Sequence, residues 1–78
     1  MKYPDGQEVR LADRVKLWEG CQGIVVASLD TGEFSDGYSA DDWGYLKRGV
    51  LIESDKASLI HYLQPEESME LLQRNARA

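Results

Sequence analysis

Alternating polar and apolar residues mark the first clear element of the chain. Within residues 13–18, Val15 and Leu17 share one face and basic side chains take the other. This two-residue period is typical of a half-buried strand. Residues 24–29 are rich in β-branched residues and apolar at almost every position. We therefore predict that they form the central strand of a sheet, covered on both faces.

The second half of the chain predicts a hairpin and a helix. Residues 50–54 and 57–63 are apolar runs separated by a tight turn, which indicates an antiparallel hairpin. Pro65 and the two glutamates after it have the composition of a first helical turn. Met69 and Leu72 would then form an apolar stripe, so we predict a C-terminal helix over about residues 65–76.

The chain length and these elements together indicate one small domain. Seventy-eight residues are enough for a single core. About five short strands with glycine-bearing turns predict a mostly β, small antiparallel barrel over residues 1–78. A long acidic loop (residues 30–46) and the short C-terminal helix complete this expected fold.

The net charge of −5 lies wholly in the acidic loop. Residues 1–29 carry four basic and four acidic side chains, and residues 47–78 carry five of each. Residues 30–46 have no lysine or arginine, and they contain five carboxylates: Asp30, Glu33, Asp36, Asp41 and Asp42. Such a local negative field favours a basic partner and disfavours nucleic acid and anionic lipid.

Four of the seven aromatic residues share the acidic loop, namely Phe34, Tyr38, Trp43 and Tyr45. Aromatic anchors beside charges are typical of a protein-binding surface. We expect Phe34 and Trp43 to pack against the domain and Tyr38 to be exposed. Ser39 is expected to cap a short helical turn over residues 40–43. The predicted protein-binding residues are Glu33, Asp36, Tyr38, Asp41, Asp42 and Trp43.

The reactive residues do not form a catalytic or metal-binding motif. His61 is the single histidine and Cys21 the single cysteine, so neither a catalytic constellation nor a Cys/His zinc site is expected. The loop carboxylates could bind calcium, but their spacing does not match an EF-hand. We therefore predict no metal, no cofactor and no enzymatic activity. No apolar run is long enough to span a membrane, no secretory signal is evident, and a cytoplasmic protein is expected.

The first 30 residues resemble the start of a KOW-type SH3-like barrel. The segment Leu-Ala-Asp-Arg-Val-Lys-Leu (residues 11–17) is followed by Gly20 and by Gly-Ile-Val-Val (residues 23–26). The resemblance implies an alternative function as an RNA- or ribosome-associated module. Its basic patch would comprise Arg14, Lys16, Lys47 and Arg48. The hairpin loop lacks the basic residues that ribosomal KOW modules carry there.

A longer set of motifs resembles a family of small uncharacterised bacterial proteins. The motifs include Tyr-Pro-Asp-Gly (residues 3–6), Asp-Thr-Gly-Glu-Phe (residues 30–34), Trp-Gly-Tyr-Leu (residues 43–46) and Gly-Val-Leu-Ile-Glu (residues 49–53). The resemblance implies a bacterial immunity or inhibitor protein that neutralises a toxin through the acidic, aromatic loop. A homodimeric structural role, through an exposed strand edge, is the remaining alternative.

Overall fold

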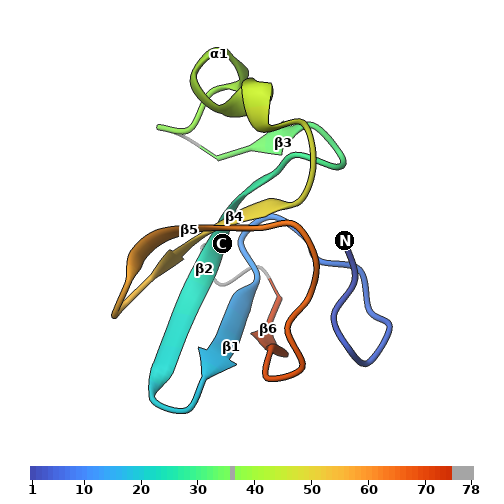
Figure 1. Ribbon diagram of the computed structural model, residues 1–78, viewed down its shortest axis with the longest axis vertical. Coiled ribbons are helices and arrows are strands. Elements are labelled where there is room, and N and C mark those ends of the chain that lie inside the picture. Colours follow the sequence, from blue (N-terminus) through green and yellow to red (C-terminus); the bar gives the residue numbers. More distant parts are fainter. Residues whose placement is uncertain (36, 75–78) are drawn as a thin grey trace.

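A six-stranded antiparallel sheet dominates the computed structural model, which describes residues 1–35 and 37–74 (Figure 1). Five strands follow the order β5-β4-β2-β1-β6, and the short strand β3 pairs with β2 off this path. The strands are β1 (Arg14–Trp18), β2 (Cys21–Ser28), β3 (Glu33–Phe34), β4 (Val50–Ser54), β5 (Ser58–Tyr62) and β6 (Glu70–Gln73). A helical turn, α1 (Ala40–Trp43), and a 3₁₀ turn, η1 (Gly44–Leu46), connect β3 to β4.

The two strands predicted from the first half of the chain are confirmed. In β1, Val15 and Leu17 are buried and the intervening Lys16 is half-buried. β2 lies in the middle of the sheet, between β1 and β4. It begins at Cys21, earlier than predicted, because the buried Cys21 and Gly23 already pair with β1.

An irregularity in β2 gives the sheet two separate apolar clusters. The register of β2 against β4 shifts between Val25 and Ala27, so the neighbours Val26 and Ala27 both face the same cluster. The main core lies on the opposite face and comprises Tyr3, Val9, Val15, Leu17, Cys21, Val25, Val50, Ile52 and Met69. The second cluster comprises Val26, Ala27, Leu29 and Leu51. One strand therefore supports both the domain core and the packing of the acidic loop.

The predicted hairpin is also confirmed, as β4 and β5. The two strands pair in continuous register from Val50 opposite Tyr62 to Ser54 opposite Ser58. The Ser54 hydroxyl accepts a hydrogen bond from the backbone N–H of Ala57 (2.8 Å) and donates one to the Ser58 carbonyl (2.9 Å). This side chain therefore satisfies backbone groups that the tight turn would otherwise leave unpaired.

The prediction of a C-terminal helix is wrong, because residues 70–73 form strand β6 beside β1. The helix signals around Pro65 are local, whereas β1 offers a row of backbone donors and acceptors that a strand can satisfy. Leu71 pairs with Val15, Met69 is buried, and Leu72 is 41% exposed. The apolar period is thus two residues, rather than the helical spacing from Met69 to Leu72. Positions 75–76 of the predicted helix lie outside the described residues.

Two aspartate substitutions distinguish this strand from a helix. We expect Leu71→Asp to lower the free energy of unfolding by about 2 kcal/mol, because it places a charge beside the main core. Leu72→Asp should cost less than about 0.5 kcal/mol, since that side chain faces water. Urea denaturation of both variants checks this, and a larger loss for Leu72→Asp would contradict the strand.

The path of the sheet ends at β5 and β6. In the part of the chain that the structure describes, these two strands do not pair with each other. A homodimer formed through such an edge stays a prediction. Within the same described residues, no helix has the length and apolar character needed to cross a membrane.

Candidate protein-binding surface

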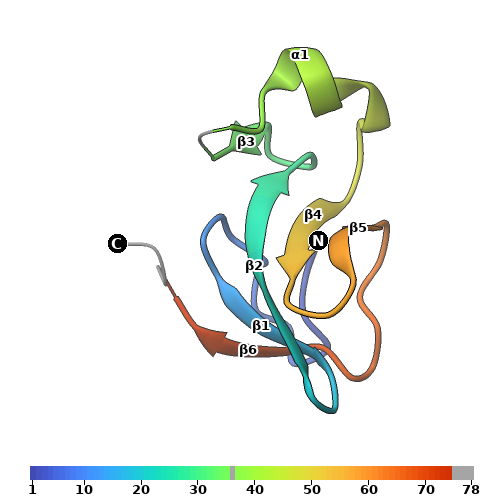
Figure 2. The same ribbon diagram turned by 90° about the vertical axis from the view of Figure 1, so that its left-hand side faces the viewer.

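Residues 30–35 and 37–46 form a lobe beyond one end of β2 and β4, which we call the acidic lobe (Figures 1 and 2). Both views place α1 and β3 at the opposite end of the molecule from the hairpin that joins β1 to β2. The lobe begins after β2 and returns to the sheet at β4, whose Val50 lies opposite Ser28. Asp36, one of the predicted binding residues, lies outside the described residues.

The helical turn of the lobe forms as its sequence predicts. The Ser39 side chain accepts a hydrogen bond from the Asp42 backbone N–H (3.2 Å), and Asp41 and Asp42 occupy the first turn of α1. Carboxylates at this end of a helix are favourable because the free N–H groups carry partial positive charge. The Ser39 hydroxyl also lies 3.1 Å from the Asp42 carboxylate, to which it donates. The cap thus holds Asp42 in place, and both acidic residues are exposed.

Aromatic side chains hold the lobe against the sheet. Phe34 and Trp43 are half-buried and pack on the second cluster, as predicted. Tyr38 was expected to be exposed, which is wrong, because it is half-buried against the same cluster, with its ring centroid 6.5 Å from that of Trp43. Because Val26 and Ala27 both belong to the second cluster, the Tyr38 ring can pack on it beside the rings of Phe34 and Trp43. The aromatics therefore anchor the lobe more completely than the sequence indicates.

The structure brings most of the predicted acidic residues to the lobe surface. Glu33, Asp41 and Asp42 are exposed, and none of them forms an ion pair with another described residue. Glu33 accepts a hydrogen bond from the Thr31 hydroxyl (2.7 Å). Within the described ranges no group of three or more His, Cys, Asp or Glu side chains is arranged to hold a metal ion. Among the described residues, no cation therefore neutralises these carboxylates.

Asp30 differs from Glu33, Asp41 and Asp42 because it forms an ion pair. One oxygen lies 2.7 Å from the α-amino group of Met1, and the other accepts a hydrogen bond from the Gly49 backbone N–H (3.0 Å). The hydrogen bond from the ammonium, followed by that from Gly49, lowers the pKa of the Asp30 carboxyl. Asp30 therefore ties the base of the lobe to the first residue and to the start of β4.

The lowered pKa of Asp30 predicts a pH-dependent contribution to stability. Its contribution is fully present above the unfolded pKa, about 3.9, and is lost as pH falls through the lower folded pKa. We therefore expect Asp30→Asn to reduce the free energy of unfolding at pH 7, and the difference from the wild type to shrink in acid. Urea denaturation at neutral and acidic pH measures this. A difference that stayed constant with pH would contradict the ion pair.

Tyr45 is an exposed residue of the lobe that is absent from the predicted binding residues. It lies in η1 and is 69% exposed, beside the acidic turn α1. The sequence does indicate this exposure, because residues two apart on a helical turn point in different directions. If Trp43 packs inward, Tyr45 must face away. The exposed surface of the lobe thus combines carboxylates with a large aromatic side chain.

The four basic residues of the RNA-binding alternative are not gathered into one patch. Lys16 lies opposite Gln22 near the β1–β2 hairpin, and its ammonium is 3.1 Å from the Glu19 carboxylate. Arg14 lies opposite Ile24 in the same strand pair. Lys47 and Arg48 instead precede β4, which begins opposite the other end of β2. RNA binding stays a prediction.

His61 and Cys21 occupy structural positions. The His61 Nε2 atom lies 2.8 Å from the Arg48 carbonyl, which connects β5 to the segment that follows the acidic lobe. Cys21 is buried in the main core, and burial is the main cause that raises the pKa of its thiol. A thiol with a raised pKa is a poor nucleophile. Both residues therefore serve the packing and connection of strands.

These features define a small, mostly β protein in which an antiparallel sheet carries an acidic, aromatic lobe. Comparison of the chain with protein-family models, curated proteins and solved structures found no match.

Proposed function

We propose that this protein is a non-enzymatic protein-binding module whose acidic lobe binds a basic surface of a partner protein. The observation that carries the proposal is the set of exposed carboxylates of Glu33, Asp41 and Asp42, which have no cationic partner among the described residues. They lie in the segment that holds the whole net charge of −5. A surface charge without an internal partner contributes little to stability but can steer association and select a partner.

The aromatic residues support the same proposal. Phe34 and Trp43 fasten the lobe to the second cluster, so its charges are held in a defined arrangement before binding. Preorganisation lowers the entropic cost of association. Tyr45, 69% exposed beside these charges, is the kind of side chain that becomes an anchor in an interface.

The specific class that we propose is a bacterial inhibitor or immunity protein that covers a basic site on a toxin. Its support is the family resemblance of the sequence motifs, together with the acidic lobe. For the fold, we propose an SH3-like barrel. The strand order supports it, because the first long strand, β1, pairs with both the next strand and the last one, as in a small SH3-like barrel.

The test is affinity capture from a lysate of the source organism, followed by binding measurements on the captured protein. The double variant Asp41→Asn/Asp42→Asn removes two charges from the lobe and keeps the shape of both side chains. We expect it to bind the partner about tenfold more weakly, and the affinity of the wild type to fall with added salt.

The matched control is Glu66→Gln/Glu67→Gln, which changes the net charge equally at exposed positions outside the lobe. It should retain the affinity of the wild type. Equal weakening by both double variants would indicate a general effect of charge. No weakening by the lobe variant would contradict the proposed function.

A further inference from the structure

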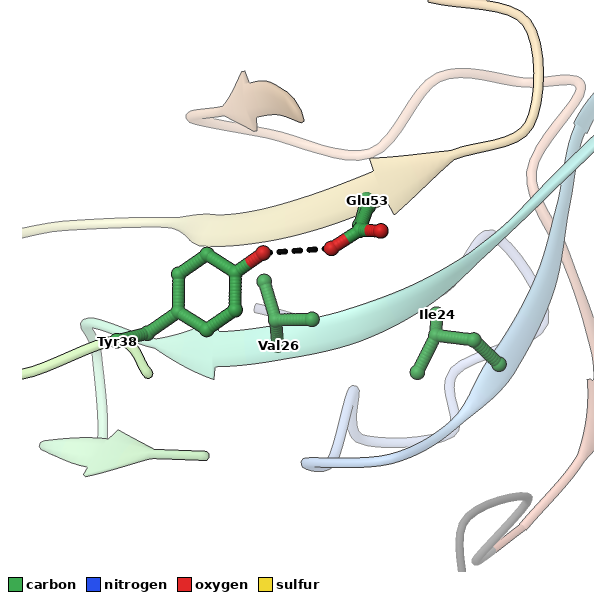
Figure 3. Close-up of a pocket in the computed structure, with 4 residues that line it drawn as sticks. All are labelled: Ile24, Val26, Tyr38 and Glu53. Atoms are coloured by element: carbon green, nitrogen blue, oxygen red, sulfur yellow. Dashed lines mark hydrogen bonds between the residues drawn. The ribbon is translucent and has the colours of Figure 1, made fainter. Parts of the chain in front are cut away.

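A small hollow lies between the acidic lobe and the outer face of the sheet (Figure 3). Ile24, Val26, Tyr38 and Glu53 line it, and its volume is about 170 Å³. Ile24 and Glu53 are direct cross-strand neighbours in β2 and β4, whereas Tyr38 comes from the lobe. The Tyr38 hydroxyl donates a hydrogen bond to the Glu53 carboxylate (2.5 Å), so lobe and sheet meet at this point.

The size and lining of the hollow limit what it can hold. Pockets for small-molecule ligands and cofactors usually have volumes of about 300–1,000 Å³. At about 170 Å³ this hollow is smaller, on the scale of one side chain. Two branched aliphatic residues and a tyrosine ring suit an apolar stem, and the Glu53 carboxylate gives the site a negative end. Lysine and arginine have this combination of an aliphatic stem and a cationic head.

The surrounding charge favours the same occupant. Glu53 has no ion-pair partner among the described residues, and the charged side chains of the adjacent lobe are all negative. The nearest cation in strand register is Arg14 of β1. It lies opposite Ile24 of β2, which in turn lies opposite Glu53 of β4, so Arg14 is separated from Glu53 by one strand. A cationic head at the Glu53 end is therefore closer to the carboxylate than to Arg14.

We propose that this hollow receives a single lysine or arginine side chain of a partner protein, with its stem on Ile24 and Val26 and its charge at Glu53. This inference rests on the proposed function and names the contact that would accompany binding at the lobe. Tyr38 links the hollow to the acidic lobe, because its ring packs in the lobe and its hydroxyl orients the Glu53 carboxylate.

The test is an NMR titration of the isotope-labelled protein with three capped amino acids. Nα-acetyl-lysine amide and Nα-acetyl-arginine amide carry the proposed head group, and Nα-acetyl-norleucine amide has an aliphatic stem without charge. We expect the two cationic probes to shift the methyl signals of Ile24 and Val26, and the norleucine probe to leave them unchanged. Glu53→Gln should weaken binding of the cationic probes by about fivefold, the upper range for an exposed ion pair. Glu67→Gln is the matched control and should not change it.

Several results would overturn the inference. Equal shifts with norleucine amide would indicate an apolar site without charge selection. Shifts of the Asp41 and Asp42 amides alone would place the cation on the lobe surface. An unchanged affinity of Glu53→Gln for the cationic probes would exclude the hollow as their binding site. Tyr38→Phe keeps the ring but removes the hydroxyl, so it should also weaken the binding of the cationic probes. The Asp41→Asn/Asp42→Asn capture experiment does not depend on Glu53, so the proposed function can hold while this inference fails.

Discussion

Replacing Asp13 with alanine should cost about 2–4 kcal/mol of stability, because it leaves interior hydrogen-bond donors without their acceptor. Domains of this size have free energies of unfolding of roughly 4–12 kcal/mol, at about 0.05–0.15 kcal/mol per residue. The variant should therefore lose a large share of its stability. Circular dichroism and urea denaturation measure the effect.

The reason is that Asp13 is completely buried and accepts three hydrogen bonds on one oxygen. The donors are the Tyr3 hydroxyl (2.6 Å), the Arg10 backbone N–H (2.8 Å) and the Arg74 guanidinium (2.9 Å). Burial, and then the hydrogen bond to Asp13, raises the pKa of Tyr3, which therefore keeps its proton. Alanine would leave a buried hydroxyl and a backbone N–H without an acceptor.

Two further variants separate the charge of Asp13 from its shape. Asp13→Asn keeps an acceptor oxygen and should cost about 1–2 kcal/mol, less than the alanine variant. Arg74→Gln should fall between the two, because it leaves a buried carboxylate with two neutral donors. If Asp13→Ala were no less stable than Asp13→Asn, the network would not hold the fold together.

Replacing Gly49 with alanine should cost about 3 kcal/mol or more, combining backbone strain with an overpacked contact. Gly49 has a φ of +87°, and an added Cβ would lie 2.0 Å from the Tyr62 carbonyl oxygen. That oxygen belongs to the backbone of β5, so it cannot rotate away. Gly49 also accepts a hydrogen bond from the Leu29 N–H (2.9 Å). The substitution therefore disturbs both the hairpin and the base of the acidic lobe.

Gly20→Ala is the matched control for this prediction. Gly20 has a φ of +85°, but an added Cβ there would meet no atom within 4 Å. Only the backbone strain, about 1–2 kcal/mol, should then appear. Thermal denaturation of both variants measures the difference, since 1 kcal/mol corresponds to about 4–8 °C for a domain of this size. Equal melting temperatures would contradict the close contact at Gly49.

The elements that were predicted correctly depend on short-range patterns. The alternation around Val15 and Leu17 and the β-branched run of β2 each require only a few neighbouring residues to interpret. The same is true of the Ser39 cap. The C-terminal segment was predicted incorrectly because its local helix signals compete with pairing to β1, more than 50 residues earlier in the chain. The strand is favoured over the helix only once β1 is in place in the sheet.

The candidate site divides in the same way. The concentration of charge in residues 30–46 is evident from the sequence. The inward packing of Tyr38 and its bond to Glu53 depend on the irregularity in β2 and on a strand 15 residues away. No local period encodes such contacts. The hollow was therefore not predictable from the chain, although the lobe beside it was.

The pairing of β1 with β6 also affects how quickly the protein can fold. Arg74 and Asp13, which meet at this edge, are 61 residues apart, and Ser68 donates a hydrogen bond to the Leu17 carbonyl across 51 residues. Closing a loop of this length lowers the conformational entropy of the chain before the stabilising contacts have formed. Proteins dominated by such distant pairs fold in milliseconds to seconds, slower than helical bundles. The β1–β2 and β4–β5 hairpins can form early, whereas β6 joins the sheet only when residues 70–73 reach β1.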